Sequence, residues 1–298
     1  MAEVNEFEQY ITANDKLSKL SKRTYQSSYN KLRQGVDELR KVDEQTIIDY
    51  LDIVNNIGEI NNATYVNVLN VAIQVRNHFE KSTDQLFKKK VVLSQMVKNE
   101  RLAKKTVYAE MTEDEKTHSV TDLRNYLNML FAEEKWREYI INYLLIHFHC
   151  RNKDVNLTIT NSITQARSDN NKNYLVVVPS YITYIRNDFK TCGKYGRQTA
   201  RIAVSKFLFA VNAFVEQSGG LETGDLFLLS TGQNRQINYD SIQKYIAGKT
   251  LDNLGQSIYN KIITTDAVRR KDLKSLRTIS SRRGTSLEVL LDFYDLNI

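Results

Sequence analysis

The sequence predicts a mainly α-helical protein with one small antiparallel β-sheet. Only 11 glycines and one proline, Pro179, interrupt 298 residues, and so few turn residues argue against an all-β sandwich. Helical spacing of apolar residues runs through most of the chain, and only residues 174–204 are dominated by β-branched and aromatic runs. The length suggests two domains, and a hydrophobic fraction of 41% can build a core in each.

The first domain is expected to be all-helical and to span residues 1–105. Ser21 could cap its second helix, and Asn61 or Asn62 its fourth, because short polar side chains accept hydrogen bonds from free amides. Apolar side chains recur at helical spacing in five segments: 7–11, 22–36, 43–54, 63–79 and 82–105.

The second domain is expected at residues 120–298, after a polar, acidic linker at 106–119. Two strongly apolar helices should come first, at 120–134 and 135–150. Three strands should follow at 174–179, 180–189 and 199–204, and these would form the antiparallel sheet. The remaining helical runs are 204–217, 241–262, 270–284 and 286–294. This domain is therefore predicted to be α+β.

Charge and cysteine content favour an intracellular protein with an acidic partner. Lys and Arg number 42 against 35 Asp and Glu, a net charge of +7, which suits a nucleic acid but is common on solvated surfaces. Two cysteines exclude a disulfide scaffold and indicate a reducing compartment. The acidic N-terminus does not resemble a secretory signal, and the apolar run 139–150 is too short for a membrane span.

Motifs for common enzyme chemistry are absent, including glycine-rich phosphate loops, HExxH, GxSxG and CxxC. His147, His149 and Cys150 carry zinc-ligand chemistry, but no second His/Cys cluster accompanies them. In a helix His147 and Cys150 would share a face and His149 would not. We therefore predict packing at the end of a buried helix, and no metal.

Three basic features remain. Arg151 follows the apolar helix, and Asp154 three residues later could pair with it. Lys190 lies at a predicted hairpin tip, near the basic side chains Lys194 and Arg197. Residues 261–283 carry eight basic and two acidic side chains, and Lys274 and Arg277 would share one helix face. Each feature alone is more typical of a solvated surface or a salt bridge; their order along the chain is the stronger signal.

That order resembles the tyrosine recombinase (phage integrase) family. The family has an arginine followed three residues later by an acid, which is similar to RNKD at 151–154. It also has a lysine on a β-hairpin, similar to NDFKT at 187–191, and a His/Lys-x-x-Arg pair, similar to KSLR at 274–277. Residues 187–196 and 225–246 look particularly like integrases of eukaryotic DNA viruses and virus-like mobile elements. The resemblance implies a helical, SAM-like core-binding domain at 1–105 and an α+β catalytic domain at 120–298.

The resemblance also implies roles. Arg151, Arg277 and Lys274 would clamp a scissile phosphate, Lys190 would protonate the leaving 5′ oxygen, and Asp154 would support Arg151. Further DNA contacts are expected from Lys194, Arg197, Arg270 and Lys271. The partners would be double-stranded DNA and further copies of the chain, as a tetramer, with no cofactor, metal or membrane. The expected location is the nucleus or a viral replication site.

The sequence departs from the family near its end. The family's final His or Trp would fall near Leu296, and its nucleophilic tyrosine beyond that, whereas the chain stops at Ile298. Tyr294 is a less favoured nucleophile, because the family has a buried apolar side chain there. We therefore expect the nucleophile to be missing from this chain. Three alternatives stay open: a recombinase-like DNA-binding protein without cleavage, a type IB topoisomerase, and an unrelated helical interaction protein.

Overall fold

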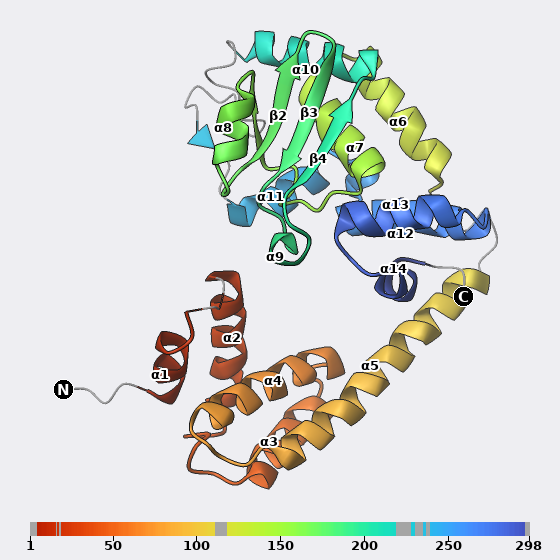
Figure 1. Cartoon of the computed structure of the whole chain (residues 1–298). Helices are drawn as coiled ribbons and strands as arrows, with labels where there is room; N and C mark the ends of the chain where they lie inside the picture. The colour runs from red at the N-terminus through yellow and green to blue at the C-terminus, as the bar shows by residue number, and fades with distance from the viewer. Residues whose placement is uncertain are drawn as a thin grey trace. The chain divides into compact units, whose positions relative to one another are not determined.

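The prediction of a mainly helical protein with a small sheet is confirmed by the structure, a computed structural model (Figure 1). It describes residues 5–15, 17, 19–110, 118–218, 228–229, 235–236 and 239–295. The chain divides into two compact units, Met1–Lys104 and Lys105–Ile298. Each unit is described by itself below.

Helices form the first unit throughout its described part. They are α1 (Glu6–Thr12), α2 (Lys19–Leu32), α3 (Glu44–Asn56), α4 (Asn62–His78) and α5 (Asp84–Glu110), which continues past the unit boundary. Asn61 caps α4 by accepting a hydrogen bond from the Thr64 amide at 2.8 Å. The predicted cap at Ser21 is wrong, because α2 begins at Lys19 and encloses Ser21 in its first turn.

Buried charged groups tie these helices together. The Glu44 carboxylate accepts hydrogen bonds from the Ser82 hydroxyl and from the amides of Gln85 and Leu86 at the start of α5. Burial acts to raise the pKa of Glu44, but these hydrogen bonds outweigh it and lower the pKa below its ordinary value. Arg76 donates in turn to carbonyls of the loops before α3 and α5.

The expected linker at 106–119 is partly helical, because α5 runs to Glu110. Residues 111–117 lie outside the described part of the chain. The next helix, α6 (Val120–Ala132), starts at a capping box in which Ser119 and Asp122 exchange hydrogen bonds.

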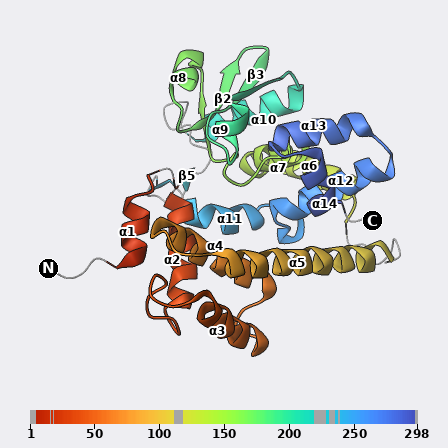
Figure 2. The same ribbon diagram turned by 60° about the horizontal axis from the view of Figure 1, so that its bottom comes forward.

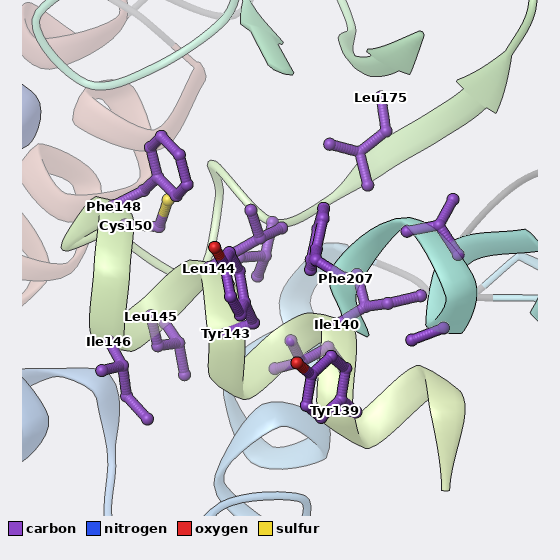
Figure 3. Packing of buried hydrophobic residues seen from close by; sticks show 14 of the residues in the cluster. Tyr139, Ile140, Tyr143, Leu144, Leu145, Ile146, Phe148, Cys150, Leu175 and Phe207 are labelled. Carbon is purple, nitrogen blue, oxygen red and sulfur yellow. The ribbon is translucent and has the colours of Figure 1, made fainter. Parts of the chain in front are cut away.

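Helix α7 (Trp136–Phe148) forms the centre of the second unit, and nearly all of its side chains are buried. Its apolar residues pack against α6, the sheet and α10 (Ser205–Gln217). Figure 3 shows Leu175 of the sheet directed towards Leu144 of α7 and Phe207 of α10. The rings of Tyr143 and Phe207 stack at 4.2 Å between centroids. This core fixes the end of α7, where Arg151 follows.

The sheet is mixed, so the prediction of a purely antiparallel sheet is wrong. The strands β1 (Leu157–Thr160), β2 (Asn173–Val178), β3 (Tyr181–Arg186) and β4 (Gln198–Ile202) lie in this order. The β2–β3 and β3–β4 pairs are antiparallel, as expected. β1 and β2 pair in parallel, and the connection between them contains the short helix α8 (Ile163–Ser168). β1 has four residues, too few for an alternation pattern to be detected in the sequence.

The remaining elements are mostly helical. A short helix, α9 (Cys192–Tyr195), lies between β3 and β4. The predicted helical run 241–262 divides at Gly248 and Gly255 into α11 (Tyr239–Ala247), the 3-10 turn η3 (Leu251–Asn253) and α12 (Gln256–Arg269). α13 (Leu273–Arg283) and α14 (Leu287–Tyr294) pack on α12 (Figure 2). The two-residue strands β5 (Leu228–Leu229) and β6 (Arg235–Gln236) form a separate pair. Among the described helices, none has the length and apolarity that a bilayer span requires.

Candidate functional site

Helix α13 presents Lys274 and Arg277 on its exposed face. Together with Thr278, Ser281 and Arg282, both residues line a shallow hollow. Positions three or four residues apart share a helix face, so these five side chains form one stripe. The stripe carries three positive charges.

The opposite face of α13 explains this orientation. Leu276 and Ile279 are buried and pack against Ala267 of α12 and Leu290 of α14. Asp272 caps the helix by accepting a hydrogen bond from the Ser275 amide at 2.9 Å. Because the apolar face is fixed in a core, Lys274 and Arg277 must point to solvent.

The C-terminal end of α13 is held by side chains from four other segments. The last carbonyls of a helix lack partners within the helix, and here each of four consecutive carbonyls accepts a side-chain hydrogen bond. The donors are Gln198 Nε2 to Ser281 O (3.1 Å), Arg186 Nη2 to Arg282 O, Arg151 Nη1 to Arg283 O (2.7 Å) and Thr191 Oγ1 to Gly284 O (3.0 Å). Residues far apart in the sequence thus meet at one helix end.

Arg151 reaches that helix end from the loop after α7 and is half-buried. Asp154 contacts Arg151 through the backbone: the carboxylate accepts a hydrogen bond from the Arg151 amide at 3.0 Å. The guanidinium that pairs with Asp154 belongs to Arg186, at 3.0 Å, and both side chains of this ion pair are buried. The expected Arg151–Asp154 side-chain pair is therefore replaced by an Arg186–Asp154 pair.

Lys190 is exposed and lies between two residues that contact the same helix end. Thr191 donates to Gly284 O, and the buried Phe189 lies beneath Gly284. Gly284 has φ 61° and ψ 52°, the left-handed conformation that glycine adopts without strain. The loop carrying Lys190 is thus attached to the helix that carries Lys274 and Arg277.

The other predicted DNA contacts differ in their surroundings. Lys194 is exposed, with its ammonium 5.4 Å from the centre of the Tyr195 ring. Arg197 is exposed but donates to Asn187 Oδ1 at 2.6 Å and to two acceptors at the end of α8, so it braces the loop. Contact of either side chain with DNA stays a prediction.

Arg270 and Lys271, in the connection between α12 and α13, are also exposed. Arg270 forms ion pairs with Asp266 at 2.9 Å and with Asp272 at 3.8 Å. Lys271 has a positive φ of 54° in the tight connection between the two helices. Asp266 and Asp272 therefore offset part of the positive charge of this connection.

A second hollow adjoins the first, and Ser281 and Arg282 line both. The Arg282 guanidinium lies 4.7 Å from the centre of the Phe148 ring, and Arg186 forms part of the floor. Sequence reasoning missed Arg186, which lies inside a predicted strand. Arg282 belongs to the basic run 261–283, but no motif separated it from its neighbours.

The less favoured nucleophile, Tyr294, lies at the edge of the described residues. Tyr294 is the last residue of α14, and its side chain lies outside the described part of the chain, as does Leu296. Within the string 225–246, residues 225–227, 230–234 and 237–238 lie outside it as well.

Residues at the end of α7 are packed rather than grouped as ligands. His149 is buried, and burial lowers its pKa to about 3, so the imidazole is neutral. The Cys150 thiol is buried 3.3 Å from the Tyr184 hydroxyl, and burial raises the pKa of Cys150 to about 12. Within the described residues, no three His, Cys, Asp or Glu side chains are grouped as a metal site would need.

Comparison with known proteins gives a distant structural likeness. No protein-family model and no curated protein matches the sequence. Among solved structures, the chain is similar to one described as the crystal structure of XerA recombinase, with 11% identity and a TM-score of 0.39. The alignment covers 98% of this chain and 92% of that one.

Proposed function

We propose that the second unit binds the phosphodiester backbone of duplex DNA and acts in tyrosine-recombinase-type strand breakage and rejoining. The observation that carries this proposal is the meeting of three sequence motifs at α13. Arg151 caps the end of the helix, the Lys190 loop is attached to Gly284, and Lys274 and Arg277 are on its exposed face.

The charges suit this chemistry. A tyrosine oxygen would attack phosphorus, forming a 3′-phosphotyrosyl bond and breaking the bond to the 5′ oxygen, while negative charge grows on the nonbridging oxygens. Arg151, Arg277 and Lys274 would stabilise that charge, since preorganised cations act without reorganisation. Lys190 would give its proton to the leaving 5′ oxygen. Tyr294 is a less favoured candidate for the nucleophile. The expected assembly is a tetramer on two DNA sites.

Salt dependence of duplex binding tests the phosphate site. Each phosphate contact contributes a slope of about −0.9 to log K against log salt, so Lys274→Ala and Arg277→Ala should each reduce the slope by about one. Lys206→Ala is the matched control, because Lys206 is an exposed lysine on α10 that lines neither hollow. Equal slopes for all three variants and the wild type would contradict the phosphate site.

Cleavage needs a separate test on a duplex selected by this protein from a random pool. If Tyr294 is the nucleophile, the wild type forms a covalent adduct, and neither Tyr294→Phe nor Lys190→Ala does. A substrate with sulfur at the 5′-bridging position should restore the adduct to Lys190→Ala, because a thiolate leaves without a proton. Salt-sensitive binding without any adduct would favour the alternative of a non-cleaving DNA-binding protein. Relaxation of supercoiled DNA by a monomer would instead favour a type IB topoisomerase.

A further inference from the structure

Arg186 is a buried cation whose guanidinium donates to three acceptors. It is the last residue of β3 and only 3% exposed. One arm of its guanidinium pairs with Asp154, and the other donates to Arg282 O and to Gln198 Oε1. The group lies 5.2 Å from the centre of the Phe189 ring, so it is enclosed by protein on several sides.

Stability alone does not explain a charge in this position. Removing two charges from water costs several kcal/mol per ion, and well-packed apolar side chains often serve as well as a buried ion pair. Apolar side chains, however, cannot hydrogen-bond to two polar groups and so fix the distance between them. Asp154 holds the backbone of Arg151, and Arg282 O is adjacent to the carbonyl that the Arg151 guanidinium contacts.

We infer that Arg186 is a positioning residue, which fixes Arg151 relative to the helix carrying Lys274 and Arg277. The inference rests on the proposed phosphate site. Arg186 spans from Asp154, beneath the Arg151 backbone, to the last turn of α13. Arg282 and Arg283 also join the end of α13 to His147 O and His149 O at the end of α7. Arg186 adds the link from α13 to Asp154, so without it the loop at 151–154 would hold the Arg151 guanidinium less firmly for a phosphate.

A double-mutant cycle tests this role. Arg186→Lys keeps the charge, but its single ammonium cannot reach both Asp154 and α13. We expect duplex affinity at 0.1 M salt to fall about 10-fold in Arg186→Lys and in Arg151→Ala, one phosphate contact each. The double variant should lose no more than either single one, because both changes remove the same contact. In the control cycle with Lys206→Ala, the effects should add.

Folding is measured in parallel. Trp136 is the single tryptophan and is buried in α7, so its fluorescence reports unfolding of the second unit alone. If Arg186→Lys does not fold, Arg186→Met combined with Asp154→Asn removes both charges at similar volume. That double variant should be folded and should still lose about 10-fold in affinity.

Two outcomes overturn the inference alone: a folded Arg186 variant with wild-type affinity, or losses that add to those of Arg151→Ala. If Arg151→Ala itself binds duplex like the wild type, the phosphate site is wrong, and the role of Arg186 falls with it. The Arg151→Ala measurement therefore separates failure of the proposed function from failure of the inference.

Discussion

Substitution of Gly284 by alanine should loosen the end of α13. Gly284 has φ 61°, and an alanine in this left-handed conformation costs about 1–2 kcal/mol. A Cβ atom there would lie 2.2 Å from Thr191 Oγ1 and 3.3 Å from Phe189 Cε2. Thr191 must then move and lose its hydrogen bond to Gly284 O, and overpacking of this kind costs about 1–3 kcal/mol.

The two contributions together predict a loss of about 3 kcal/mol in the free energy of unfolding of the second unit. For a unit of this size the melting temperature should fall by roughly 6–12 °C. The assay is thermal unfolding followed by Trp136 fluorescence, which is insensitive to the first unit. Gly193→Ala is the control, because a Cβ atom at Gly193 meets nothing within 4 Å.

Removal of the obstructing hydroxyl should relieve part of the loss. In Thr191→Ala with Gly284→Ala the backbone strain remains but the steric clash does not, so the double variant should be more stable than the sum of the single effects. A melting temperature for Gly284→Ala equal to that of Gly193→Ala would refute this account of the helix end. Strictly additive effects of Thr191→Ala and Gly284→Ala would refute the steric part.

Three further outcomes are expected. The pKa of Glu44 is lower in the folded than in the unfolded protein, so ionised Glu44 stabilises the fold above the ordinary glutamate pKa, and this stabilisation is lost as the pH falls. Amide exchange at the start of α5 should therefore become faster in acid, and Glu44→Gln should weaken this dependence on pH. The half-buried Cys192 should react with iodoacetamide at pH 8 while Cys150 does not, until the protein is unfolded. Asp154→Ala should destabilise the second unit by about 3–5 kcal/mol in urea unfolding, because it leaves Arg186 buried without its partner, whereas a loss below about 1 kcal/mol would contradict that pairing.

Local features were predictable where their cause is local. Asn61 caps α4 because a short polar side chain precedes an apolar helical run, and both signals lie within a few residues. Ser21 has the same chemistry but lies inside α2, since the helix begins at Lys19. Propensity identifies residues able to cap a helix, but packing of the whole helix decides which position becomes its start.

The sheet shows where local signals end. β2 and β3 are six-residue runs rich in β-branched and aromatic side chains, which the sequence reveals directly. β1 has four residues, Leu157–Thr160, and is a strand because it pairs with β2 along its length. A parallel partner is defined by the fold rather than by the strand's own sequence, so its direction could not be predicted.

The candidate site was predictable only in its outer part. Arg151, Lys190, Lys274 and Arg277 were recognisable by their order along the chain. Arg186 was not, because its partners Asp154 and Arg282 are 32 and 96 residues away in the sequence. A residue that acts by joining distant segments leaves no spacing pattern, and it becomes visible only when those segments are placed together.

The direction of α13 suggests an electrostatic effect of the buried residues Arg186 and Gly284 at its C-terminal end. The C-terminus of a helix carries partial negative charge, which would repel a phosphate brought to it. Arg151 and Arg186 donate to the carbonyls of that end, and Lys190 belongs to the loop attached there, so positive charge is gathered where the helix is negative. In the proposed phosphate site, a DNA phosphate would then approach the C-terminal end of the stripe, at Ser281 and Arg282, without meeting unpaired carbonyls. Gly284 and Arg186, which offer no exposed face to DNA, should therefore affect duplex binding as strongly as an exposed lysine.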